Sequence, residues 1–299
     1  MKILNLVNKI IKHTLWYQNY WCGVHKFWHL NTFNLDVINL GSTSGVWDFN
    51  YNNLPIKGMN WAIGPQSLMH DFNVLKNYFS YIKEGGSVII TLCPFSSLIT
   101  QYSTHQNLKY YTFLHPATIN EFNEKEREQA LQIKQNPFKV MPLFCIKETT
   151  KEFLRALIPR QSKNKTNFSQ NALYYIGIWK KQFNIQDLTA ELQSQHKTEQ
   201  MQRAQLLHKM VQFCEERDLH PVIVIPPIHR ELSKQLPIEF RENYINSFIE
   251  KADIPKTLFY NFIDDERFQD DKYFHNAFLM NKIGAVYFTK ELLKEIHIL

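Results

Sequence analysis

The stretch Asp36-Val37-Ile38-Asn39-Leu40 runs directly into Gly41-Ser42-Thr43-Ser44, and this junction decides the fold class. The first part is short and rich in apolar and β-branched residues, which is typical of a strand buried on both faces of a parallel sheet. The glycine ends the strand and begins a tight loop that carries three hydroxyl side chains. The segment therefore predicts a buried parallel strand with polar residues at its carboxyl end.

Four later segments have the same character, namely residues 59–63 (MNWAI), 87–92 (SVIITL), 221–225 (PVIVI) and 257–262 (TLFYNF). Between and after them, apolar residues recur at helical spacing, from Leu68 to Ile82, from Leu207 to Cys214 and from Ala285 to Ile296. We expect Gly85-Gly86 to cap the first of these helices. Strands that alternate with helices predict a three-layer α/β/α fold with a five-stranded parallel, flavodoxin-like sheet, whose ligands bind at the carboxyl ends of the strands.

The length of 299 residues is compatible with one domain, 1–299, that carries a helical insertion. The insertion is expected at 95–190, where helical stretches at 120–135 and 147–157 and a polar loop at 160–171 interrupt the alternation of strands and helices. We expect it to form a cap over the carboxyl edge of the third strand. Residues 1–30 form a separate, amphipathic N-terminal segment.

Charge and cysteine content exclude several classes of function. The 34 basic residues are scattered among 28 acidic ones, so the net charge of +6 does not predict a nucleic-acid partner, although an acidic glycan remains an alternative. The four cysteines are far apart and lack zinc-ligand spacing, so we expect reduced thiols, no metal and no cofactor.

The N-terminal segment bears on localisation. Asn5, Lys9 and Lys12 break its apolar run, so it predicts neither a signal peptide nor a membrane span, and we expect a cytoplasmic protein. Its apolar face is expected to dock on the protein's own core. Peripheral contact with a membrane is the alternative.

Two motifs carry a resemblance to a known family. Gly41-Ser42-Thr43-Ser44 follows the first strand, and residues 276–285 (NAFLMNKIGA) open the last helix. In these segments the chain resembles the SGNH/GDSL hydrolase superfamily, in a form seen with bacterial surface polysaccharides. The resemblance implies a nucleophile at Thr43, with Ser42 and Ser44 as alternatives.

The same resemblance assigns the rest of the site. It implies an oxyanion-hole N–H at Gly64, which is alternatively a plain turn glycine. It also implies an oxyanion-hole position at Ser96, which stands in the block where the family supplies an Asn. It also places Asn276 where the family has the orienting carboxylate and Leu279 where it has the histidine base. Leucine cannot accept a proton, and an amide cannot stabilise an imidazolium as a carboxylate does. The chain therefore departs from the family at the residues that would carry out catalysis.

A rearranged base is one way to restore activity. Asp271 and His275 are four residues apart and would share a face if this stretch were helical. The alternative is that His275 is a surface histidine beside an acidic run, and His229, after the fourth strand, is a further candidate. Two functions follow as hypotheses: an esterase or O-acyltransferase acting on acyl groups of a bacterial surface polysaccharide or its precursor, or a catalytically silent SGNH-like module that binds a glycan or a protein.

Overall fold

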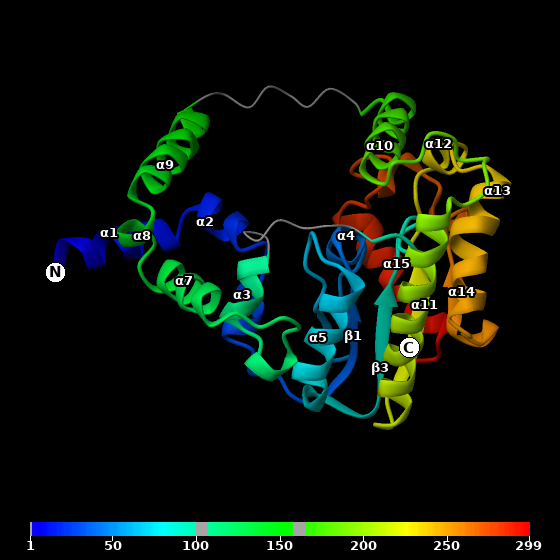
Figure 1. Cartoon of the computed structure of the whole chain (residues 1–299), viewed down its shortest axis with the longest axis horizontal. Coiled ribbons are helices and arrows are strands. Elements are labelled where there is room, and N and C mark those ends of the chain that lie inside the picture. The colour runs from blue at the N-terminus through cyan, green and yellow to red at the C-terminus, as the bar shows by residue number, and fades with distance from the viewer. Residues whose placement is uncertain (1, 100–106, 158–165) are drawn as a thin grey trace. The chain divides into compact units, whose positions relative to one another are not determined.

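The structure is a computed structural model that describes residues 2–99, 107–157 and 166–299 (Figure 1). Its contacts divide the chain into two compact units. Residues 1–31 and 102–164 form the first, here called the helical unit, and residues 32–101 and 165–299 form the second, the sheet unit. The segment 95–190, which the sequence sets apart as one insertion, is thus shared between them. That it caps the sheet stays a prediction.

The sheet unit contains the expected five-stranded sheet, in which all neighbouring strands are parallel. The strands are β1 (Leu35–Leu40), β2 (Gly58–Asn60), β3 (Ile82–Thr91), β4 (His220–Ile225) and β5 (Phe259–Asn261). Their order, β2-β1-β3-β4-β5, confirms the predicted flavodoxin-like α/β fold. The direction of winding reverses between β1 and β3, and the crevice at such a reversal is where ligands bind in these sheets.

Helices cover the two faces of the sheet. Their bounds in this unit are α4 (Thr43–Asp48), α5 (Leu68–Tyr78), α10 (Phe168–Gln182), α11 (Ser194–Glu215), α12 (Arg230–Ser233), α13 (Ile238–Phe240), α14 (Ser247–Lys251) and α15 (Lys282–Glu295). Helix α11 contacts α5, α14 and β4, whereas α4 contacts α15. Phe288 and Leu292 of α15 lie in a buried cluster with Val37, Ile89 and Val224 of the strands. The last helix, expected from the apolar pattern between Ala285 and Ile296, is therefore confirmed as a core element.

Two local expectations are wrong. Gly85-Gly86 does not cap a helix but lies inside β3, while α5 ends at Tyr78 and continues as a 3-10 turn, η1 (Phe79–Tyr81). Gly85 has a φ of +69°, and its N–H donates to the carbonyl of Asp218, where the pairing of β1 with β3 changes register. Of the expected loop at 160–171, residues 160–165 lie outside the described residues. Residues 168–171 form the start of α10, which Asn167 caps by accepting the N–H of Gln170.

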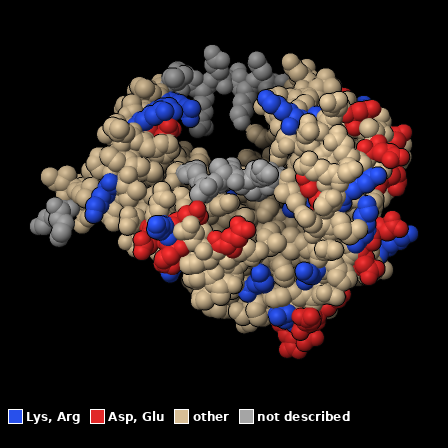
Figure 2. All heavy atoms as spheres, in the orientation of Figure 1, with Lys and Arg blue, Asp and Glu red and all other residues tan. Residues whose placement is uncertain are grey.

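Shorter turns complete the sheet unit. These are the π-helical turn η4 (Arg241–Asn246) and the 3-10 turns η5 (Lys256–Leu258), η6 (Glu266–Phe268) and η7 (Asp271–Tyr273). On the face drawn in Figure 2, basic and acidic side chains are interspersed rather than gathered into a stripe.

The helical unit joins the N-terminal segment to the inserted helices. It contains α1 (Lys2–Lys12), α2 (Leu15–Tyr20), α3 (His25–Trp28), η2 (Leu108–Thr112), η3 (Pro116–Thr118), α7 (Glu124–Gln135), α8 (Pro137–Val140) and α9 (Pro142–Leu157). The Glu152 carboxylate of α9 accepts the backbone N–H groups of Leu15 and Trp16 at 3.0 and 2.8 Å, and so caps α2. The carboxamide oxygen of Asn8 accepts the N–H of Phe138 at 2.9 Å. None of the described helices is both long and apolar enough to cross a bilayer.

Candidate functional site

The loop after β1 is held tightly at the point where the sheet winding reverses. Gly41 has a φ of +133°, and a methyl group on it would lie 2.8 Å from Cβ of Thr91 on the neighbouring strand. Its N–H donates to the Asp71 carboxylate at 2.7 Å, and the Ser42 hydroxyl accepts the N–H of Gln66 at 3.1 Å. The backbone here therefore requires glycine, which explains why the strand stops where it does.

Thr43 and Gly64 lie side by side, as the resemblance implies. A methyl group on Gly64 would lie 3.2 Å from Oγ1 of Thr43. Within the described part of the chain, no partner is seen for the Gly64 N–H or the Thr43 hydroxyl. The neighbouring Ser44 is buried, and its part as an alternative nucleophile stays a prediction. The Thr43 hydroxyl and the Gly64 N–H are therefore adjacent, and both are without a partner among the described residues.

Asn276 closes its own turn rather than orienting a base. Its carboxamide oxygen accepts the backbone N–H groups of Phe278 and Leu279 at 2.9 and 2.8 Å. Leu279 itself is buried. The position that the family uses for the carboxylate therefore carries an Asx-type turn, which uses the side-chain acceptor locally.

Asp48 fastens this loop to α4. Its Oδ1 accepts the N–H of Met280 at 2.8 Å, which ties the loop containing Asn276 to the helix that begins at Thr43. The side chain is only 1% exposed, and burial raises the pKa of its carboxyl well above the usual range. Its second oxygen has no partner among the described residues. No sequence pattern singles out Asp48, because its partner lies more than two hundred residues away.

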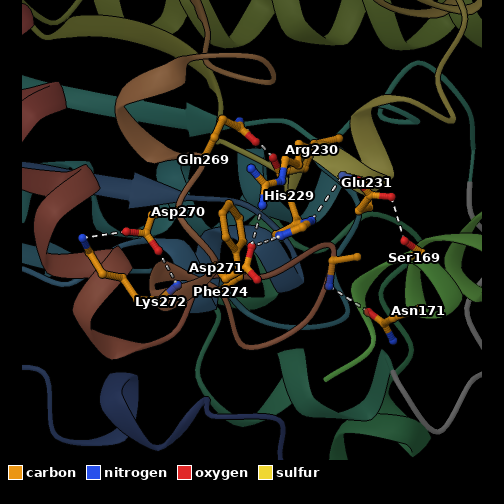
Figure 3. A network of polar contacts seen from close by, with 12 residues as sticks. Ser169, Asn171, His229, Arg230, Glu231, Gln269, Asp270, Asp271, Lys272 and Phe274 are labelled. Carbon is orange, nitrogen blue, oxygen red and sulfur yellow. Dashed lines mark hydrogen bonds and ion pairs between the residues drawn. The ribbon is translucent and has the colours of Figure 1, made fainter. Parts of the chain in front are cut away.

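The proposed pair of Asp271 and His275 is not formed. The stretch is not α-helical: η7 ends at Tyr273, and Phe274 forms an antiparallel bridge with Met280. Instead, Oδ1 of Asp271 accepts hydrogen bonds from Nε2 of His229 at 3.1 Å and from Arg230 at 3.2 Å (Figure 3). His275 is exposed and stacks on Trp47, with ring centroids 5.2 Å apart and planes 10° from parallel.

His229 is the centre of a satisfied network. It caps α12, and its Nδ1 accepts the N–H of Glu231 at 3.2 Å, so the hydrogen on Nε2 is the one donated to Asp271. The ring is 1% exposed and stacks on Phe168 at 3.9 Å, with Phe274 edge-on at 5.2 Å. Both ring nitrogens are used, which leaves His229 no lone pair to take a proton from a substrate.

The first turn of α10 is fixed to the same network, as Figure 3 shows. Besides the stacking of Phe168, the Ser169 hydroxyl donates to the Glu231 carboxylate at 2.7 Å, and the Asn171 carboxamide accepts the N–H of Ala277 at 2.7 Å. Reasoning from the sequence missed these residues. The one available signal was Asn167, an N-cap residue directly before a helical pattern.

Ser96 is used in its own turn. Its hydroxyl accepts the N–H of Cys93 at 2.8 Å, and its carbonyl accepts the Nε–H of Arg203 at 2.6 Å. The structure therefore shows Ser96 as the hydrogen-bonding residue of a turn after β3. Its proposed part in an oxyanion hole stays a prediction.

A hollow of about 620 Å³ lies at the amino edge of the sheet, the opposite end from the residues above. Its lining includes Ser87, His220, Tyr260 and the ion pair of Asp36 with Lys83, whose atoms are 2.5 Å apart. The hydrogen bond from Lys83 is the main cause of the lowered pKa of Asp36. The sequence contained no signal for this hollow, because its lining comes from the starts of several strands.

Comparison with known proteins adds no family to these observations. No protein-family model matches the chain, and no curated protein sequence matches it significantly. Within residues 2–99, 107–157 and 166–299, no group of three His, Cys, Asp or Glu side chains is arranged to hold a metal ion. The SGNH resemblance rests on the two quoted motifs and the placement of Gly64 beside Thr43.

Proposed function

We propose that the chain is a catalytically silent, SGNH-like module that binds a glycan at the carboxyl edge of its sheet. One observation carries the proposal: Asp271 is bonded to His229, whose ring nitrogens are both occupied. In the described residues, no imidazole or carboxylate makes a hydrogen bond with the Ser42, Thr43 or Ser44 hydroxyl. An unassisted hydroxyl stays protonated near pH 7 and is a weak nucleophile.

The exposed stack of Trp47 on His275 is the proposed contact surface for the glycan. Trp47 is 45% exposed and lies on α4, the helix that starts at Thr43, so it belongs to the edge where ligands of such sheets bind. A flat aromatic surface packs against the C–H face of a sugar ring, while nearby polar groups bond its hydroxyls. Asn276, the residue after His275, is half-buried and supplies such a group.

The test combines a binding and a turnover measurement on the full chain. The binding probe is a set of O-acetylated and de-acetylated bacterial surface oligosaccharides immobilised on glass. Trp47→Ala should abolish binding, whereas Phe33→Ala, which removes an exposed aromatic ring stacked on Tyr81, should not. The turnover probe is p-nitrophenyl acetate, for which no rate above buffer is expected. Binding that survives Trp47→Ala would overturn the proposal.

The second candidate function is an esterase or O-acyltransferase acting on acyl groups of a surface polysaccharide. The placement of the Thr43 hydroxyl beside the unpaired Gly64 N–H favours it, because a nucleophile and an oxyanion donor must adjoin. This function predicts ester turnover that Thr43→Ala abolishes. If His275 is the base, His275→Ala should abolish the turnover as well.

A further inference from the structure

The helical unit leaves an apolar stripe of α1 uncovered. Ile3, Leu6 and Ile10 recur at spacings of three and four residues, so they lie on one side of the helix. Ile3 is 80% exposed, and the other two are more than half exposed. The opposite side, with Asn8 and Ile11, is buried. Helix α1 therefore uses one apolar face for packing within the unit and presents a second face outward.

Helix α9 of the same unit repeats this arrangement. Five of its exposed apolar residues recur at helical spacing, namely Leu143, Ile146, Phe153, Leu154 and Leu157. Leu143 is 82% exposed, and the others are more than half exposed. Single exposed apolar residues are common on protein surfaces and need no explanation. Two helices of one small unit that each expose a row of apolar residues indicate a contact surface.

The charges around these stripes are basic. The chain has no acidic residue before Asp36, and Lys9 and Lys12 of α1 are exposed. On α9, Lys147, Lys151 and Arg155 accompany two glutamates. Both glutamates are already engaged: Glu148 pairs with Lys151 at 2.7 Å, and Glu152 caps α2.

We propose that the helical unit docks on an anionic lipid bilayer. The apolar stripes of α1 and α9 enter the boundary between headgroups and acyl chains, and the lysines contact the lipid phosphates. An anionic bilayer fits better than a protein partner because it accepts two apolar stripes together with the excess of basic residues beside them. The proposed contact is peripheral, because only side chains of the two stripes enter the bilayer. The proposal does not depend on the glycan site.

The experiment is co-sedimentation of the full chain with phosphatidylcholine vesicles, with and without phosphatidylglycerol. Binding is expected only with phosphatidylglycerol and should weaken as salt is added. Ile3→Gln/Leu6→Gln/Ile10→Gln should lower the affinity by about tenfold or more, because each apolar side chain loses its buried area. Leu143→Gln/Phe153→Gln/Leu157→Gln should lower the affinity for vesicles by a similar factor. Lys9→Gln/Lys12→Gln should lower the affinity for vesicles roughly fivefold for each lysine removed.

The matched control is Ile238→Gln, which removes an apolar side chain from α13 that is also mostly exposed, but in the sheet unit. It should bind vesicles as the wild type does, and circular dichroism should show every variant folded. The proposal is overturned if the wild type stays in the supernatant, or if both stripe variants still pellet. It is equally overturned if light scattering shows that the stripe variants convert a dimer to a monomer, since the stripes would then bind a second copy.

Discussion

Replacing His229 by alanine should destabilise the sheet unit strongly, although His229 has no catalytic part in the proposed function. The ring makes two hydrogen bonds, to Asp271 and from Glu231, each contributing about 1 kcal/mol. It also packs between Phe168 and Phe274, and aromatic pairs contribute about 0.5–1.5 kcal/mol each. Because Asp271 is partly exposed, its bond lies at the lower end of the range for charged partners. We expect the free energy of unfolding to fall by about 3–5 kcal/mol.

Scanning calorimetry measures this loss as a lower unfolding temperature of the sheet unit, by roughly 10 °C for a unit of this size. Hydrogen exchange in β4 and α12 reports the loss in the sheet unit itself, separately from any change in the helical unit. The matched control is His275→Ala, which removes an exposed ring and should cost about 1 kcal/mol or less. Equal shifts for the two variants would refute the reasoning, because the network around His229 would then add nothing to stability.

Two further predictions follow from buried contacts. Gly284→Ala should lower the free energy of unfolding by about 2 kcal/mol or more in urea denaturation, because the added methyl group would lie 2.2 Å from the carbonyl oxygen of Tyr273. Ala285→Gly in the same helix turn is the control for helix propensity. An unchanged denaturation midpoint for Gly284→Ala would contradict the clash. Asp48→Asn should make the protein more stable than the wild type as pH rises above about 4. In the wild type, the raised pKa of the buried carboxyl keeps it protonated in the folded state, whereas the unfolded state releases the proton. Wild-type stability therefore falls as pH rises over that range. Denaturation curves of both proteins at several pH values measure the difference, which should vanish at lower pH; a constant difference at all pH values would show that Asp48 does not titrate this way.

The sheet could be predicted from the sequence because its signals are local. A run such as Asp36–Leu40 is rich in apolar and β-branched residues, and a glycine directly after such a run is a local signal for the end of a strand. The periodicity of the last helix is equally local, and Asn281 caps it by accepting the N–H groups of Ile283 and Gly284. These features need no knowledge of distant contacts, so the fold class and the approximate positions of the strands could be inferred from pattern, whereas the order of the strands is set by their pairing.

The partners of the polar side chains were decided only by the tertiary structure. From the sequence, Asp271 and His275 would pair if the stretch were helical, but the chain is not helical there and Asp271 meets His229 of the loop after β4. Asp48 likewise meets Met280, and Phe168 meets His229. A hydrogen bond or ring contact requires atoms within a few ångströms, and that proximity depends on how the crossovers bring distant strand ends to one edge of the sheet.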